Sequence, residues 1–526
     1  MRILHNAKIR TMNAKQPFAA ALAVENGRIL AVGSNDDVLA LANPTAEIED
    51  LHGQTVWPGL TDAHIHLDYY AFSLNKVDCE TSTKEECLRR IAERASTTPS
   101  GGWVIGHGFD QNQWLEGYGS AAELDAASGD HPAFLTAKSL HAAWANHLAL
   151  LLAGIERFTA DPAGGQIQRD QFGEPTGILL ENAVEMVERL LPSPSDLEAA
   201  AAIDQAQKHL WRMGLTGVHD YDRRRCFQAL QILDSQDRLR LHVVKGIPHE
   251  TLAEAVSLGL RSGFGGDYLR VGAVKLFSDG ALGPQTAAMM QPYENSSNNG
   301  VLLLNQGDIL EIGQQAARSG LSLAVHAIGD RANHEMIHGF ALLRAHEKHN
   351  HFPHLRHRIE HVQVLLPEDL HRLAELDLIA SMQPIHATSD MDTADHYWGF
   401  RSRYAYAFHS LLDAGTRMAF GSDAPVESPN PFLGMHAAVT RMRSSGYPGG
   451  QGWYPEQRIT LEQALAGFTT GPAFAAGLER VHGQLMPGFF ADMIVLAEDP
   501  FTLMPETIYQ LQPVATMVSG EWVWRH

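Results

Sequence analysis

From about Thr216 to Val426 the chain repeats one pattern, in which an amphipathic helix is followed by a glycine and a short apolar run. Ser195 is a typical N-cap for the first of these helices, and Glu198 completes a capping box. Gly214 can end the helix in the left-handed conformation before the apolar run begins. Helices that alternate with short continuous apolar strands predict βα units and a parallel sheet, which is an α/β fold.

Eight such strands are expected, the number that closes a (β/α)8 barrel of the TIM type. They span Val56–His66, Thr216–Asp220, Leu239–Ile247, Leu269–Phe277, Leu321–Ala327, Arg356–Val364, Leu378–Ile385 and Met418–Ser422. The first connection is much longer than the others, so we expect an insertion after the first barrel strand at about residues 70–215. Within it we predict a helix over Lys84–Ser96, with Thr83 and Glu86 as its capping box.

The two ends of the chain have a different pattern, with short alternating β segments separated by turns such as Asn26-Gly27 and Ser519-Gly520. Neither end alone buries a sheet face well. We therefore predict one small β-sandwich domain built from residues 1–57 and 476–526, with a metal-dependent TIM-barrel hydrolase domain over 58–475 between its two halves.

Composition limits the partners and the compartment. With 44% apolar and 19% charged residues among 526, the chain can bury a large core, and its net charge of −21 argues against binding nucleic acid or an anionic membrane. The three cysteines form no disulfide framework, and neither a signal peptide nor a run of about 20 apolar residues is evident. We expect a cytoplasmic protein that acts on a small-molecule substrate, with homodimer formation left open.

His64 and His66 stand at i and i+2 at the end of the first barrel strand, so both side chains point to the same face and can reach one metal ion. Two histidines hydrogen-bonded within a polar core would look the same. Lys275 lies in an apolar strand, where desolvation opposes its charge. It either pairs with an acid such as Asp279 or, as a neutral amine, takes up carbon dioxide to become a carbamate that can bridge two metal ions.

His326 and His361 are single histidines at the ends of predicted strands, and each alone would more often be a satisfied core residue. Asp423 alone would be an ordinary turn or N-cap aspartate. All of these candidates, however, lie at the C-terminal ends of barrel strands and therefore at the same mouth. Imidazole and carboxylate together are the ligand set of zinc or a similar ion, so the group predicts a metal centre.

The sequence resembles the amidohydrolase superfamily, and more narrowly the amidohydrolase-3 branch, the YtcJ-like proteins related to N-substituted formamide deformylase. The resemblance covers essentially the whole chain and is carried by the segments PGLTDAHIHL, GWVIGHGFDQNQW, HAAWANHLAL, VKLFSDGALG, VHAIGDRA, RIEHVQ, MQPIHATSDM and GSDAPVESPNP.

The resemblance implies a centre of one or two divalent metal ions, with zinc expected ahead of manganese, iron or nickel. It implies that His64, His66 and Asp423 bind the more buried ion and that His326 and His361 bind the more exposed one. Lys275, carboxylated by carbon dioxide, would bridge the two ions. Asp423 would also be the catalytic residue, taking a proton from the attacking water.

Substrate contacts are expected from His219 and His386 on the barrel and from Trp114 and His141 in the insertion. Helix packing or plain polar rim positions would explain these residues too. The expected reaction is hydrolysis of a non-peptide carbon–nitrogen bond, such as that of an N-acyl or N-formyl amine. A cyclic amide, carbamate or ester remains an alternative, because the ligands do not choose the leaving group; a non-catalytic scaffold of the same fold is a remote one.

Overall fold

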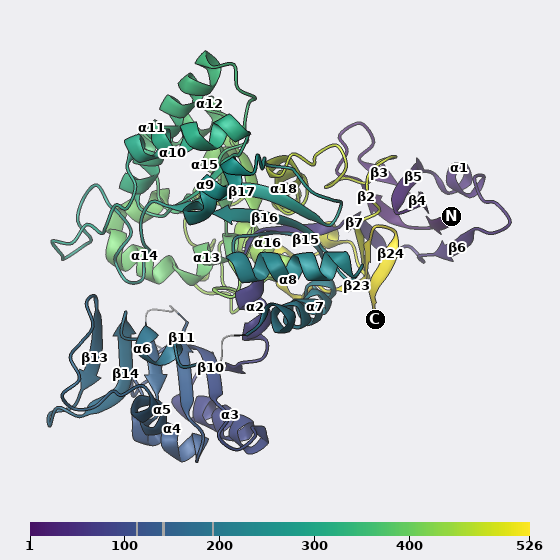
Figure 1. Ribbon diagram of the computed structural model, residues 1–526. Coiled ribbons are helices and arrows are strands. Elements are labelled where there is room, and N and C mark those ends of the chain that lie inside the picture. Colours follow the sequence, from purple (N-terminus) through teal and green to yellow (C-terminus); the bar gives the residue numbers. More distant parts are fainter. Residues whose placement is uncertain (112–113, 139–141, 192–193) are drawn as a thin grey trace. The chain divides into compact units, whose positions relative to one another are not determined.

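The computed structural model describes residues 1–111, 114–138, 142–191 and 194–526, and the chain divides into two compact units. The first unit contains residues 1–68 and 200–526, and the second contains residues 69–199. In Figure 1 the second unit is drawn mainly in shades of blue. The long connection after the first barrel strand therefore folds as a compact body.

The first unit contains a parallel eight-stranded barrel, which confirms the predicted fold class. Its strands are β8 (Leu60–Ile65), β15 (Leu215–Asp220), β16 (His242–Pro248), β17 (Leu269–Phe277), β18 (Leu323–Ala327), β19 (Arg358–His361), β20 (Ile379–Met382) and β21 (Arg417–Phe420). The two end strands meet where the Asp423 amide donates to the His64 carbonyl at 2.7 Å and the His66 amide donates to the Ala424 carbonyl at 2.9 Å. This contact nearly closes the barrel and brings the last strand beside the first.

Helices surround the barrel strands (Figure 1). They are α7 (Asp196–Arg212), α8 (Arg224–Ser235), α9 (Leu252–Ser257), α10 (Gln306–Ser319), α11 (Asp330–His349), α12 (Arg372–Glu375), α13 (Pro384–Ser389), α14 (Met391–Trp398), α15 (Phe408–Asp413), α16 (Pro431–Thr440), α17 (Leu461–Gly467) and α18 (Thr470–Ala475). The capping box predicted at Ser195 is present, because the Ser195 amide donates to the Glu198 carboxylate at 2.8 Å and the Glu198 amide donates to the Ser195 hydroxyl at 3.2 Å. Gly214 adopts a φ of 85° after the helix, as expected for a left-handed stop.

The predicted first barrel strand, Val56–His66, is in fact two strands. Residues Thr55–Pro58 form β7, which pairs with strands of the terminal domain, and only β8 enters the barrel. The chain changes sheets at Gly59, where a Cβ atom would lie 2.3 Å from the Thr216 hydroxyl oxygen. Glycine is needed for this close approach, and the pair Pro58-Gly59 was the sign of the change of sheet in the sequence.

Both ends of the chain contribute to a pair of sheets that pack face to face. One sheet contains β5 (Arg28–Gly33), β4 (Ala21–Glu25), β1 (Arg2–His5) and β6 (Glu47–Asp50); the other contains β24 (Glu521–Arg525), β23 (Pro513–Val518), β22 (Met493–Leu496), β7, β2 (Lys8–Arg10) and β3 (Phe18–Ala19). Their shared core includes Leu4 and Leu22 from the first sheet and Met493 and Met517 from the second. The core thus needs both termini, which explains why neither could form a sandwich alone.

The second unit is a mixed six-stranded sheet with helices. In sheet order its strands are β13 (Gly165–Arg169), β14 (Pro175–Glu181), β12 (Ala142–Ala145), β11 (Ala133–Ala137), β10 (Val104–Phe109) and β9 (Val77–Asp78). Its helices are α3 (Lys84–Thr97), α4 (Ala121–Ser128), α5 (His147–Leu152) and α6 (Glu185–Glu188), and α2 (Leu67–Ser73) leads into it. Among the residues that the structure describes, no helix has the length and apolar character needed to cross a lipid bilayer.

The capping box predicted for α3 is only half formed. The Thr83 hydroxyl accepts from the Glu86 amide at 3.3 Å. The Glu86 carboxylate pairs instead with Arg89 and Arg90, at 2.7 and 3.0 Å. Ion pairs one helical turn away have therefore replaced the return bond that the sequence pattern predicted.

A buried ionic cluster joins the barrel to the terminal sandwich. The Nε2 atom of His242, at the start of β16, lies 3.2 Å from the Asp492 carboxylate, which also contacts the His482 Nδ1 atom at 3.0 Å. His242 Nδ1 donates to the Asp267 carbonyl at 2.8 Å, so a second proton on Nε2 makes the ring cationic. Although burial opposes the charge, Asp492 raises the pKa of His242, while the two histidines hold the pKa of Asp492 below its usual value.

We predict that Asp492→Asn destabilises the protein by about 3–5 kcal/mol, because it leaves a buried imidazolium without its counter-ion. The contribution of His242 is fully present below its ordinary pKa and is lost as pH rises through the raised value; that of Asp492 is lost as pH falls through its lowered value. The difference in thermal midpoint between wild type and variant should therefore be largest at about pH 4–6.5 and shrink at alkaline pH. An equal difference at every pH would contradict this assignment.

Candidate metal centre

Six predicted site residues lie at the C-terminal ends of barrel strands, at one mouth. His64 is the last residue but one of β8 and His66 follows that strand, while Lys275, His326 and His361 lie near or at the ends of β17, β18 and β19; Asp423 follows β21. Two of these residues, His361 and Asp423, adopt left-handed backbone conformations with φ of 71° and 61°. Such conformations are uncommon for residues other than glycine, and they give these two side chains a direction that the backbone of a regular strand does not allow.

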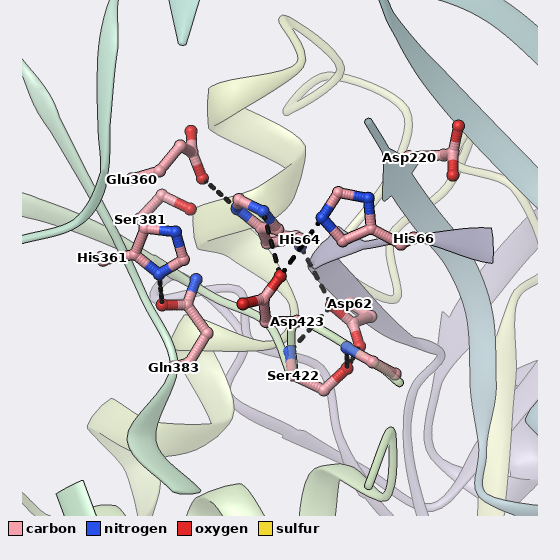
Figure 2. Close-up of polar contacts among 12 residues, drawn as sticks. Asp62, His64, His66, Asp220, Glu360, His361, Ser381, Gln383, Ser422 and Asp423 are labelled. Carbon is pink, nitrogen blue, oxygen red and sulfur yellow. Dashed lines mark hydrogen bonds and ion pairs between the residues drawn. The ribbon is translucent and has the colours of Figure 1, made fainter. Parts of the chain in front are cut away.

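His64, His66 and Asp423 form the tightest part of the group (Figure 2). The Nε2 atoms of both histidines lie 3.4 Å from the same carboxylate oxygen, Oδ1 of Asp423. Their ligand-capable atoms are all within 4.8 Å of one another. The i, i+2 spacing therefore brings both imidazoles to the same side of the strand, as strand geometry predicts, where both reach Oδ1 of Asp423.

The opposite nitrogen of each imidazole is already hydrogen-bonded to a carboxylate. His64 Nδ1 lies 2.6 Å from Oε2 of Glu360, and His66 Nδ1 lies 2.9 Å from Oδ1 of Asp222. Because a carboxylate only accepts, each Nδ1 carries the proton of a neutral ring, and each Nε2 then presents its lone pair to Asp423. The two lone pairs and the carboxylate oxygen repel one another unless a proton or a metal cation lies among them.

The pKa values of the two rings express this conflict. Burial, followed by the charge of Lys275, lowers the pKa of His64 to about 4. Burial also opposes a charge on His66, yet its hydrogen bonds to Asp222 and Asp423 raise its pKa to about 10. Without a metal the cluster therefore draws one extra proton, and it draws it to His66. A bound cation would supply the same positive charge, so the donor set fits a metal ion.

His326 and His361 lie beside this group, with ring centroids 4.5 Å apart, and the His361 ring is 5.1 Å from that of His64. His361 Nδ1 is 2.8 Å from the Gln383 side-chain oxygen, and His326 Nε2 is 2.9 Å from the Gly280 carbonyl. The lone pairs are thereby left on Nε2 of His361 and Nδ1 of His326. Each ring is oriented by a protein acceptor, as is usual for metal-binding histidines.

The Lys275 side chain is buried, and its Nζ atom has no hydrogen-bond partner among the residues that the structure describes. The Nζ atom lies over two aromatic rings, 5.1 Å from the Tyr221 ring centroid and 4.8 Å from that of Phe277. Burial lowers the pKa of Lys275 to about 8. An unpartnered amine of low basicity is what carbamate formation requires.

Asp279, the alternative partner of Lys275, uses its carboxylate for hydrogen bonds to the backbone. Its carboxylate accepts backbone N–H groups from Ala288, Ile328 and Gly329 at 2.8 to 3.0 Å. Asp279 therefore fixes the loops after β17 and β18. A simple ion pair between Asp279 and Lys275 does not account for the buried amine.

The four residues expected to touch substrate lie in different surroundings. His386, in α13, stacks with His361 at 6.4 Å, and its buried Nε2 has no hydrogen-bond partner in the described residues. His219 is buried in β15, with Nδ1 2.9 Å from a guanidinium nitrogen of Arg358. Trp114 belongs to the core of the second unit, where it stacks on Phe109 and donates to the Thr81 carbonyl at 3.0 Å.

The fourth of these residues, His141, lies outside the described residues. Among the described residues of the first unit, His386 lies beside the predicted ligands. Its ligand-capable atom lies within 4.8 Å of those of His361 and Asp423.

Sequence reasoning missed the residues that orient the ligands, chiefly Glu360 and Arg358. The Arg358 guanidinium holds Glu360 through bonds of 2.5 and 3.0 Å, and it also contacts the Ser381 hydroxyl. Although burial opposes the charge, Arg358 and His64 hold the pKa of Glu360 well below its usual value. The signal was available, since Arg358 and Glu360 alternate within a buried strand and are as costly there as Lys275.

We predict that Glu360→Gln weakens metal binding by about 10–100-fold, because an amide orients the His64 ring less firmly than a carboxylate. Competition with a chelator of known affinity measures the change. Glu347→Gln is the matched control, since Glu347 is likewise buried and paired with a histidine and an arginine, at 2.8 and 2.9 Å. Equal metal affinity in Glu360→Gln and wild type would refute the orienting role.

A cluster of imidazole and carboxylate groups at the C-terminal mouth of a parallel barrel defines a metal-dependent hydrolase of the TIM-barrel class. Residues 47–524 match the amidohydrolase family. YtcJ of Bacillus subtilis (strain 168), named as an amidohydrolase, is 32% identical, with 99% of each chain covered. N-substituted formamide deformylase of Arthrobacter pascens is 30% identical, over 98% of this chain and 96% of its own.

Among solved structures, a metal-dependent hydrolase from Pyrococcus furiosus is 30% identical with a TM-score of 0.78, covering 95% of this chain and 100% of its own. The chain belongs to the amidohydrolase family. The resemblance found in the sequence is thereby confirmed, as are the barrel fold and the assignment to metal-dependent hydrolases.

Proposed function

We propose that this protein hydrolyses a non-peptide carbon–nitrogen bond, the amide of an N-acyl or N-formyl amine. The observation that carries the proposal is the convergence of the Nε2 atoms of two imidazoles on the Asp423 carboxylate, an arrangement that a bound metal cation would satisfy in place of a proton. Family membership supports hydrolysis, and the similarity to a formamide deformylase favours an amide as the bond cleaved.

We assign the ligands as follows. His64, His66 and Asp423 would hold one divalent ion, with zinc favoured by the imidazole and carboxylate donors. His326 and His361 would hold a second. Lys275, as its carbamate, would bridge the two, which would give its buried Nζ the partners that it lacks in the protein alone.

Bound divalent ions supply a water of lowered pKa and polarise the substrate carbonyl. The proton transfers fall to Asp423. Although burial opposes its charge, its hydrogen bond to His66 and the nearby His64 and His361 hold the pKa of Asp423 well below its usual value, so it begins the reaction ionised. Its carboxylate can take the proton of the attacking water and return it to the leaving nitrogen. His386 would donate a hydrogen bond to the substrate.

The test of the proposal is amine release from a panel of N-formyl amines, N-acyl amines, cyclic imides, aryl carbamates and esters. The assay is run with zinc and bicarbonate, and again after chelation. We expect chelator-sensitive release of an amine from an open-chain amide. Turnover confined to cyclic imides, carbamates or esters would overturn the amide assignment. A metal-loaded protein that turns over no compound of any of these classes would contradict the proposed function.

We predict that Asp423→Asn lowers turnover by about 10²–10⁴-fold, because an amide cannot accept the water proton. The Michaelis constant should change much less, since binding of the substrate does not depend on that transfer. Asp413→Asn, at an exposed position at the end of α15, is the control. A near-normal rate with normal metal content in Asp423→Asn would exclude the proton-transfer role.

We predict that Lys275→Ala loses both metal and activity, and that a short carboxylic acid such as propionate partly restores them by replacing the carbamate. Methylammonium chloride at the same ionic strength is the matched control, because an amine cannot bridge two cations. Metal content is measured by elemental analysis and activity on a substrate from the panel. Full metal content and full activity in the variant would make Lys275 a structural residue.

A further inference from the structure

A second group of metal-ligating side chains lies on α11. His334 and His338 are one helical turn apart, so their imidazoles share a face of the helix, with ring centroids 4.4 Å apart. The 3-10 helix η2 (Pro367–Asp369) brings the Asp369 carboxylate beside them, 2.9 Å from His334 Nδ1. The ligand-capable atoms of the three residues are all within 4.8 Å of one another.

The burial of these groups favours a bound cation. The Asp369 side chain is only 3% exposed, whereas that of His334 is 29% exposed. A metal ion from solvent could therefore reach the imidazole first and the buried carboxylate beside it. Within the described part of the chain, the His338 side chain makes no hydrogen bond, and the His334 side chain makes a single one, to Asp369. Nitrogen atoms with lone pairs therefore remain available beside an anionic oxygen.

The group differs from the His242 cluster described above. There, His242 uses both ring nitrogens, one on a backbone carbonyl and one on Asp492, and both oxygens of that carboxylate are bonded to histidines. A proton satisfies His242, and among the described residues that cluster leaves only the His482 Nε2 atom without a hydrogen bond. In the group on α11, both ring nitrogens of His338 and the Nε2 atom of His334 have no hydrogen-bond partner among the described residues, so they can bind a metal ion.

We propose that His334, His338 and Asp369 form a second metal site, separate from the centre at the barrel mouth. Two imidazoles and one carboxylate suit Zn²⁺ and its neighbours Co²⁺, Ni²⁺ and Cu²⁺, whereas Mg²⁺ and Ca²⁺ prefer all-oxygen ligands. Water would complete the coordination, because both histidines are partly exposed.

The position of the site links it to the loops that carry two predicted ligands. Helix α11 begins four residues after His326, and η2 follows β19, which ends at His361. Asn333, beside His334, donates from Nδ2 to the carbonyls of Ala327 and Val364, at 3.2 and 3.1 Å, and so already joins the same two loops. A cation bound at the site would add a second brace between α11 and the segment after β19.

Zinc stoichiometry tests the proposal directly. The double variant His334→Gln, His338→Gln is compared with wild type by equilibrium dialysis at stepwise increasing free zinc, followed by elemental analysis. The matched control is His349→Gln, His351→Gln, because both histidines are exposed, His349 ends the same helix and His351 lies two residues beyond it. We expect the site variant to bind one zinc per chain less than wild type and the control to bind the same as wild type.

Equal zinc binding by the site variant and wild type at every concentration would overturn the proposal, as would an equal loss in the control. Two further variants guard against misfolding. His338→Gln alone changes a partly exposed side chain and should also lose the ion, and Asp369→Asn should weaken zinc binding by about 10–100-fold, as expected where a carboxylate binds or orients a ligand. Unchanged zinc affinity in both would equally contradict the site.

Discussion

The carboxylate of Asp423 faces the Nε2 atoms of two imidazoles, and a neutral ring carries no proton at that position. This follows from what lies behind the rings, because Glu360 and Asp222 each accept a hydrogen bond from the Nδ1 proton of one ring, at 2.6 and 2.9 Å. In a buried site such a group of acceptors is costly unless a positive charge lies among them. The two supporting carboxylates are themselves neutralised, Glu360 by Arg358 and Asp222 within a network that contains Lys245. The mouth of the barrel is therefore built to hold a cation.

The barrel brings the ligands together at a cost in backbone conformation. His361 and Asp423 both adopt positive φ angles, each worth roughly 1–3 kcal/mol of strain. Closure of the barrel offsets that strain, because the Asp423 amide bonds to the His64 carbonyl at 2.7 Å. Gly421 permits this approach, since a Cβ atom there would lie 2.4 Å from the His64 nitrogen. The last strand can thus deliver Asp423 to the HxH pair only through a glycine and a left-handed turn.

Sequence pattern predicted the parallel barrel, which the structure confirms, because that fold depends on local periodicity. The domain bounds and the assignment of the metal ligands stay predictions. Tertiary contacts decided what the pattern did not. The change of sheet at Gly59 is marked in the sequence only by the pair Pro58-Gly59, and the Glu86 carboxylate pairs with nearby arginines instead of the helix amide. The Trp114 indole packs in the core of the second unit, and its expected contact with substrate stays a prediction. Glu360 was missed beside His361, although a buried charge in a strand is itself a signal.

The central claim is that a cation bound through Nε2 of both histidines of the HxH pair resolves the repulsion around Asp423. Anomalous diffraction at the zinc edge, from crystals of the zinc-loaded protein, tests it most directly. We expect a peak about 2.0–2.2 Å from Nε2 of His64, Nε2 of His66 and a carboxylate oxygen of Asp423. Zinc-loaded protein with no peak at the barrel mouth, or with a peak that contacts His64 through Nδ1, would contradict it.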